Sequence, residues 1–236
     1  MKEEIKDILE SKDLKEITND VVEKVLDNQI TDEFLKEVPV VKSLIALKNM
    51  YSSISDKIFI KKAMKVLLEL GDTTGKERAE LLVNLNDEHE SGSEKILMAI
   101  DKLETMKKCI VFGRLCKLKA LNKIDINSFL RLTKILQDSY LDDLYDITYF
   151  TSQLPDKVTP GENAFIQIIA LGLIYQYQTE QKPIRQSDRL TGDDPEYIGG
   201  EIEFYYLLSD TGEILLKYYY DLFPERLLNE KMVVEI

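Results

Sequence analysis

Apolar residues recur at steps of three and four along most of the first 150 residues, and this spacing limits the fold more than any other feature. The pattern starts at Ile5, Ile8 and Leu9 and still runs through Ile147. A repeat near 3.6 residues places these side chains on one face of a helix. Because 44% of the 236 residues are hydrophobic, the chain can also bury a sizeable core. We therefore expect an N-terminal multi-helix domain and a mainly α fold.

Capping and turn residues divide this periodic part into separate helices. The predicted N-terminal caps are Ser55 or Asp56, Thr74 and Asp125, and two further helices are expected to start at Ser93 and at about Thr105. The first of these helices is expected to end at Gly71 and the second near Leu85. The last is expected to continue or bend through Ile147. We predict that residues 1–150 form one helical domain, in which an acidic helical arm, 1–37, precedes a core, 38–150.

The pattern changes after Phe150, where Pro155, Pro160 and Gly161 indicate a linker. A short helix is predicted over 162–170, and two strands rich in Tyr, Ile and Phe over 171–179 and 201–208. The residues between the strands, 180–200, are polar and are expected to form a long loop. Ser209 or Asp210 is expected to cap a last helix that runs to about Asp221. Residues 151–236 thus predict a small α+β domain with one β-hairpin.

The segments LGLIYQYQ and EIEFYYLLSDTGEILLKYYY, with the long loop between them, resemble the end of a winged-helix domain over about residues 160–221. In that family a short helix leads into a strand, a wing, a returning strand and a helix that often begins with Ser/Thr-x-x-Gly. The resemblance implies DNA binding through the short helix. Here that helix, 162–170, has no Lys or Arg, and residues 154–223 carry a net charge of −7, which would repel phosphate. We therefore interpret the unit as a protein–protein module.

A second resemblance covers residues 38–150. The segments Pro39-Val-Val, Ser55-Asp-Lys-Ile-Phe-Ile-Lys-Lys and Ser128-Phe-Leu-Arg-Leu-Thr are similar to helical bacterial proteins encoded on mobile elements near phage-defence or phage genes. The resemblance implies a role in phage defence or counter-defence and no particular activity.

Charge is strongly segregated along the chain. The net charge of −12 consists of −6 for residues 1–37, +2 for 38–153, −7 for 154–223 and −1 for 224–236. Within 38–153, residues 38–68 carry +5 and residues 105–136 carry +7. Three interpretations stay open: acidic segments cover the basic helices, within the chain or between subunits; the basic helices bind a nucleotide or nucleic-acid phosphate; or they meet an anionic membrane surface. The candidate anion-binding residues are Lys61, Lys62, Lys65, Lys107, Lys108, Arg114, Lys117 and Lys119.

No catalytic motif is found. His89 is the only histidine, which excludes a multi-histidine metal site, and a single histidine in an acidic loop is typical of a surface residue. The segment 71–77 lacks the spacing of a phosphate-binding loop, and 87–92 lacks the closing Glu of a calcium loop. Asp142, Asp143 and Asp146 can share one helical face and could hold magnesium, but such carboxylate clusters are usually solvated. We expect no catalytic residues, no metal and no cofactor.

The two cysteines, Cys109 and Cys116, lie seven residues apart among apolar and basic residues and are expected to be reduced packing thiols of a cytoplasmic protein. The sequence as a whole predicts a non-enzymatic interaction or regulatory protein of bacteria or phage that binds a protein partner, an anionic partner or a second copy of itself. The alternatives are a nucleic-acid-binding regulator that uses the basic helices and a membrane-acting effector. The candidate protein-interface residues are Tyr205, Tyr206, Tyr218, Tyr219 and Tyr220.

Overall fold

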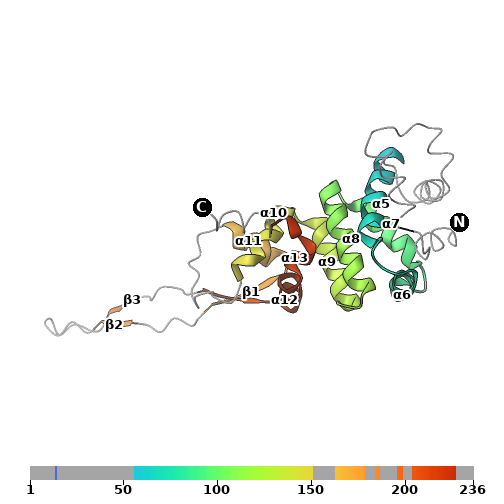
Figure 1. Cartoon of the computed structure of the whole chain (residues 1–236). Helices are drawn as coiled ribbons and strands as arrows, with labels where there is room; N and C mark the ends of the chain where they lie inside the picture. The colour runs from blue at the N-terminus through green and yellow to red at the C-terminus, as the bar shows by residue number, and fades with distance from the viewer. Residues whose placement is uncertain are drawn as a thin grey trace, which may run out of the picture. The chain divides into compact units, whose positions relative to one another are not determined.

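The computed structural model describes Leu14 and residues 56–150, 163–178, 184–186, 196–198 and 204–226. In these residues the fold is mainly helical with a β-hairpin in the C-terminal part, which confirms the predicted fold class (Figure 1). The chain divides into two compact units: unit 1 is Met1–Leu141 with Tyr218–Ile236, and unit 2 is Asp142–Lys217. The C-terminal end therefore belongs with the helical unit, whereas the sequence placed it in the α+β domain. The predicted arm 1–37 lies outside the described residues except Leu14, which is helical and buried.

Unit 1 contains six described helices that lie wholly within it. They are α5 (Asp56–Leu70), α6 (Gly75–Leu85), α7 (Gly92–Lys102), α8 (Met106–Ala120), α9 (Ile126–Asp138) and α13 (Tyr219–Leu222). The next helix, α10 (Leu141–Tyr145), begins at the last residue of this part of unit 1. The predicted boundaries of α5 and α6 and the predicted starts of α8 and α9 agree with these to within one or two residues. The helix expected to continue or bend through Ile147 instead ends at Asp138 and is followed by α10 and a 3₁₀ helix.

Helix α8 is at the centre of unit 1, because it packs against α5, α6, α9 and α13 (Figure 1). Its buried side chains point in several directions around the helix and include Val111, Phe112, Leu115 and Leu118. The ring of Phe112 lies 6.2 Å from that of Phe129 on α9. At Gly113 an added Cβ would lie 2.9 Å from the carbonyl oxygen of Val66, so α5 and α8 approach each other closely. The helix is therefore buried on most of its circumference.

Local capping explains where the helices of unit 1 begin. The Thr74 hydroxyl accepts a hydrogen bond from the Glu77 N–H, and the Glu77 carboxylate accepts one from the Thr74 N–H, which forms a capping box. The helix that was predicted to start at Ser93 begins earlier, at Gly92, because Ser91 and Glu94 form a second capping box. Gly92 itself lies against α6, where an added Cβ would be 2.2 Å from the Leu82 carbonyl oxygen.

Unit 2 follows the predicted order of helix, strand, strand and helix. After α10 come η1 (Asp146–Phe150), α11 (Asn163–Ala170), β1 (Ile174–Gln178), β2 (Ile184–Gln186), β3 (Glu196–Ile198), β4 (Phe204–Leu208) and α12 (Asp210–Lys217). Helices α11 and α12 pack against β1 and β4 respectively, and both contact η1. The last predicted helix is interrupted at Tyr218, so that it ends as α12 in unit 2 and resumes as α13 in unit 1.

The described strands form two antiparallel pairs. β1 is antiparallel to β4, with Ile174 opposite Leu208, and β2 is antiparallel to β3, with Ile184 opposite Ile198. Gln178 pairs with Phe204, and the second ladder resumes after the same interval on both strands. The segment 180–200, predicted as loop, therefore contains a second short antiparallel ladder. The apolar residues between 180 and 200 are too few and too scattered to predict a strand from the sequence. The pairing of β2 with β3 follows from the register that β1 and β4 already set.

Ser209 joins the hairpin to the helix that follows it. Its hydroxyl donates to the carbonyl oxygens of Gly172, at 2.8 Å, and Leu173, at 3.1 Å, and accepts from the Gly212 N–H at 3.1 Å. An added Cβ at Gly212 would lie 2.1 Å from the Leu173 carbonyl oxygen. The Ser209-Asp-Thr-Gly212 sequence thus combines an N-cap with a close approach of α12 to the start of β1.

Candidate protein-binding surface

Three of the eight candidate anion-binding residues are buried in unit 1. The ammonium groups of Lys62 and Lys108 donate to the carbonyl oxygens of Asp101, at 3.2 Å, and Gln137, at 3.1 Å. Lys119 lies 3.4 Å from the side-chain oxygen of Asn122. These three side chains are only 3% to 6% exposed as residues. They are polar contacts within the helical core, in which the long aliphatic stems are buried with the apolar residues.

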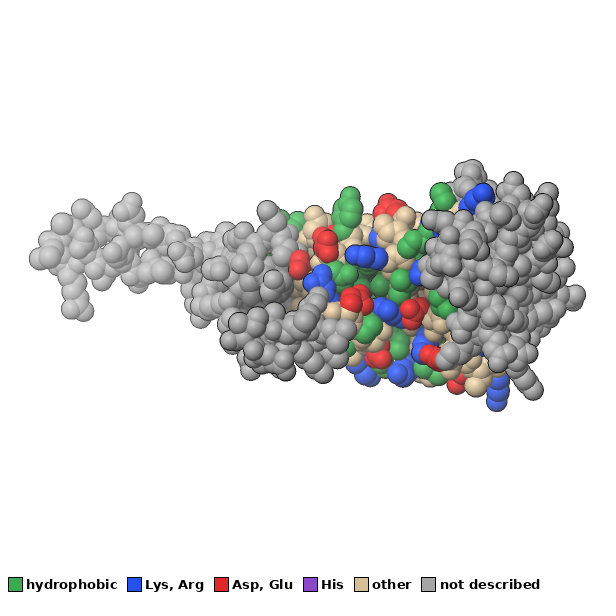
Figure 2. Space-filling model, turned by 45° about the horizontal axis from the view of Figure 1, so that its top comes forward, with side chains coloured by type: hydrophobic (Ala, Val, Ile, Leu, Met, Phe, Trp, Pro, Cys, Tyr) green, Lys and Arg blue, Asp and Glu red, His purple; other side chains and the backbone are tan. Residues whose placement is uncertain are grey.

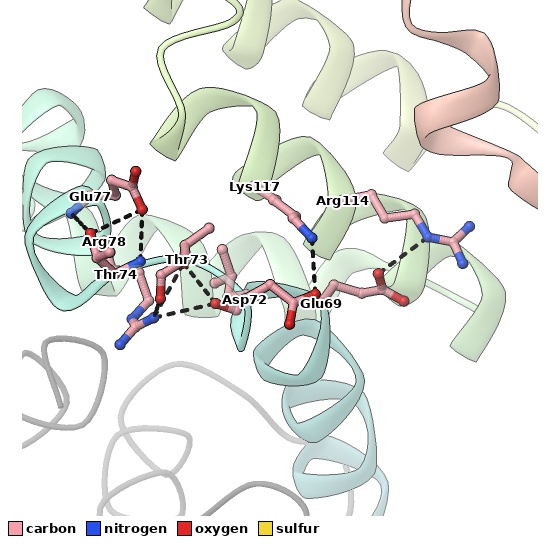
Figure 3. Close-up of polar contacts among 9 residues, drawn as sticks. Glu69, Asp72, Thr73, Thr74, Glu77, Arg78, Arg114 and Lys117 are labelled. Atoms are coloured by element: carbon pink, nitrogen blue, oxygen red, sulfur yellow. Dashed lines mark hydrogen bonds and ion pairs between the residues drawn. The ribbon is translucent and has the colours of Figure 1, made fainter. Parts of the chain in front are cut away.

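Arg114 and Lys117 form ion pairs with carboxylates of the same unit (Figure 3). Arg114 lies 3.3 Å from Glu69 and, across to the C-terminal segment, 3.2 Å from Glu225. Lys117 lies 3.2 Å from Asp72 at the end of α5. The Glu225 contact agrees with the interpretation in which acidic segments cover the basic helices.

The remaining three lysines have different surroundings. Lys61 and Lys65 on α5 are half-buried, and Lys107 at the start of α8 is exposed. On the face drawn in Figure 2, the described basic and acidic side chains are interspersed among apolar ones. The eight residues are therefore divided between core, ion pairs and surface.

The five candidate tyrosines also divide, between the two units. Tyr219 is buried on α13, with its ring 5.2 Å from those of Tyr220 and Phe223. Tyr218 donates its hydroxyl to the Lys123 carbonyl oxygen at 3.0 Å. Tyr220 is 43% exposed. The other two candidates, Tyr205 and Tyr206, lie on β4 in unit 2, where Tyr206 is half-buried.

The β1–β4 ladder has one apolar face that is open to solvent. Tyr175 and Leu207 lie directly opposite each other in the register, and Tyr177 is two residues further along β1. Successive side chains of a strand alternate between faces, so these three share one face. They are 53%, 58% and 50% exposed respectively. On the other face Ile174 is 2% exposed. We call Tyr175, Tyr177 and Leu207 the ribbon face.

Sequence reasoning predicted the strands but did not select the ribbon face. The available signal was the alternation in Ile174-Tyr175-Gln176-Tyr177, where every second residue is aromatic. Alternation shows that two faces differ, but only the packing of α11 and α12 shows which face is covered. The candidate tyrosines were instead chosen from the consecutive runs 205–206 and 218–220. Neighbouring side chains in a strand point to opposite faces, so such a run does not define one face.

Strongly perturbed ionisable groups do not converge on one place in the described part of the chain. Lys95 and the N–H groups of Glu90 and His89 lower the pKa of Asp87, and a hydroxyl and two N–H groups lower that of Asp125. Burial lowers the pKa of Arg78, whose guanidinium donates to the carbonyl oxygens of Leu70 and Thr73 (Figure 3). Each of these shifts accompanies a turn or a helix terminus, which is a structural role.

The described residues contain no group of three or more His, Cys, Asp or Glu side chains arranged to hold a metal ion. None of their helices has the length and apolar character needed to cross a bilayer.

Comparison with known proteins gives no relative for this chain. No family model, no curated protein and no solved structure matches it.

Proposed function

We propose that this chain is a non-enzymatic binding protein that docks a protein partner through the ribbon face. The observation that carries the proposal is the exposure of Tyr175, Tyr177 and Leu207 on one side of the β1–β4 ladder. Tyrosine supplies a large apolar contact area with few rotatable bonds and is enriched where partners bind. Scattered exposed apolar residues need no explanation, but a cross-strand group of three on one face is the pattern of a contact surface.

The contacts of unit 1 weigh against the alternative functions. An anion site on the basic helices would need the ammonium groups of Lys62 and Lys108, which are buried against carbonyl oxygens. A membrane-binding helix over α5 would need its apolar face, but Phe59, Ile60 and Met64 are at most 1% exposed. Residues 38–55 of that segment lie outside the described residues.

The cellular setting forms part of the same proposal. Cys109 and Cys116 are free and buried, which suits a reducing compartment and supports a cytoplasmic location. The similarity of residues 38–150 to mobile-element proteins supports a role in conflict between bacteria and phages. The order α11–β1–β4–α12 is the order that the winged-helix resemblance implies. We propose that such a unit serves here as a protein-docking module.

Site-specific photo-crosslinking in the native cells tests the proposal. A benzophenone amino acid is placed at position 175 or 177 and, as a control, at Tyr140, which is 76% exposed in unit 1. We expect one covalent adduct with another protein from positions 175 and 177 and none of that mass from position 140. Changing Leu207→Ser should suppress the adduct from position 177. The proposal is overturned if no protein adduct forms, or if the same adducts form at all three positions.

A further inference from the structure

We infer that the partner presents a positively charged segment to the ribbon face, an inference that rests on the proposed function and specifies its ligand class. Unit 2, residues 142–217, has 14 Asp+Glu against 5 Lys+Arg, a net charge of −9. The whole chain, three times as long, carries only −12. The unit that holds the ribbon face therefore carries most of the chain's excess negative charge.

The rest of the chain carries a net charge of only −3. In unit 1 the basic groups Lys95, Arg114 and Lys117 pair with carboxylates of their own unit. In unit 2, Asp210 and Glu213 are exposed on α12, the helix that directly follows β4 in the chain. A unit with a net charge of −9 favours a partner of opposite charge and disfavours one of like charge.

The same charge selects among possible occupants of the ribbon face. Nucleic acid and anionic lipid carry dense negative charge and would be repelled by unit 2. A second copy docked by the same face would bring two units of −9 together. A protein segment in which Lys or Arg alternates with apolar residues satisfies both features. Its apolar side chains would cover Tyr175, Tyr177 and Leu207, and its cations would be attracted by the net negative charge of unit 2.

Short extended peptides are a suitable probe, because β1 and β4 pair only with each other among the described residues and each has an outer edge. Three fluorescent peptides share the same apolar residues and carry Lys, Glu or Gln at the alternate positions. Anisotropy titrations use the full chain. We expect the Lys peptide to bind about tenfold tighter than the Gln peptide, as several exposed ion pairs together allow. The Glu peptide should not bind, and added salt should weaken the Lys peptide.

Matched variants locate the binding. Tyr175→Ser with Leu207→Ser should abolish binding of the Lys peptide, whereas Val83→Ser, at a position 63% exposed on α6, should not change it. Asp210→Asn with Glu213→Gln should weaken the Lys peptide severalfold. The same charge change in unit 1, Glu88→Gln with Asp221→Asn, should leave its affinity unaltered.

Failure of this inference is distinguishable from failure of the proposed function. Equal binding of the three peptides, or binding of none, overturns the basic partner while a protein adduct at positions 175 and 177 would still stand. Mapping the cross-linked segment of the partner by mass spectrometry tests the inference a second time. A segment rich in Lys and Arg supports the inference, and an acidic or neutral segment, or a second copy of this chain, overturns it.

Discussion

The guanidinium of Arg114 donates a hydrogen bond of 2.8 Å to the carbonyl oxygen of Leu222, 108 residues later in the chain. The same side chain pairs with Glu69 and Glu225. Arg114 lies on α8, and Leu222 is the last residue of α13. One charged side chain therefore satisfies the end of a short helix and holds the C-terminal segment against the centre of unit 1.

Replacing Arg114 should loosen this attachment. Arg114→Met keeps an apolar stem but leaves the Leu222 carbonyl without its charged donor, so we expect unit 1 to lose about 1–3 kcal/mol of unfolding free energy. Urea unfolding followed by circular dichroism measures the loss. Arg131→Met, at an exposed position of α9, is the control and should change stability by less than about 0.5 kcal/mol. Equal effects of the two substitutions would contradict the role given to Arg114.

The adjacent residues Lys107 and Lys108 give a direct test of whether the basic helix acts as surface or core. Lys108 is 3% exposed and donates to the Gln137 carbonyl oxygen, whereas Lys107 is exposed. We expect Lys108→Met to cost about 1–3 kcal/mol and Lys107→Met to cost almost nothing. The comparison again uses the urea midpoint. A larger loss for Lys107→Met would show that the assignment of these two residues is reversed.

The sequence predicted helices well because the signals that start helices are local. Thr74 and Asp125 each bond to N–H groups two or three residues further on, so a short window contains the whole capping interaction. The interrupted last helix was not predicted, because Tyr218 follows an apolar pattern that continues unbroken into α13. What separates α12 from α13 is their membership of different units, which depends on contacts far along the chain.

The candidate site was harder to predict, for a related reason. A run of basic residues on α8 indicates a charged surface only if part of the helix faces water. Here α8 is enclosed by four helices, so Lys108 and Lys119 are buried. Likewise, Tyr219 and Tyr175 are both tyrosines in apolar stretches, but one is 3% exposed and the other 53%. Only the tertiary packing distinguishes core from contact surface.

Two glycines of unit 2 should respond differently to alanine. At Gly212 the added Cβ would meet the Leu173 carbonyl oxygen at 2.1 Å, so Gly212→Ala should cost about 3 kcal/mol or more. At Gly172 nothing lies within 4 Å, but φ is +69°, so Gly172→Ala should cost only about 1–2 kcal/mol. Hydrogen exchange of the β1 and β4 amides reports on this unit. If Gly212→Ala is the milder change, the close approach of α12 to Leu173 is not present in solution.

Acid should destabilise the start of α9 through Asp125. Hydrogen bonds from the Ser128 hydroxyl and from the N–H groups of Ser128 and Asn127 lower the pKa of this carboxyl from its usual 3.8. A folded-state pKa below the unfolded one gives stability above the unfolded pKa, and that stability is lost as the pH falls through the folded one. Asp125→Asn keeps a capping oxygen without a titrating group, so its stability should fall less than that of the natural chain below about pH 4.

A pH series of urea midpoints checks this prediction. The exposed carboxylate variant Glu88→Gln is the control and should follow the natural chain. Identical acid profiles for Asp125→Asn and Glu88→Gln would contradict the capping role.

The two cysteine thiols should not react with a thiol reagent until unit 1 unfolds. Cys109 and Cys116 are 0% exposed on α8, and burial raises the pKa of the Cys109 thiol to about 11 and that of Cys116 further. The thiolate is the reactive form, so at about pH 8 both thiols are protonated as well as inaccessible. We expect no reaction with dithionitrobenzoate in the folded chain and reaction of both thiols in urea, with the same midpoint as the loss of helix. If one thiol reacts in the folded chain, α8 is exposed on that side, and the central position assigned to this helix is wrong.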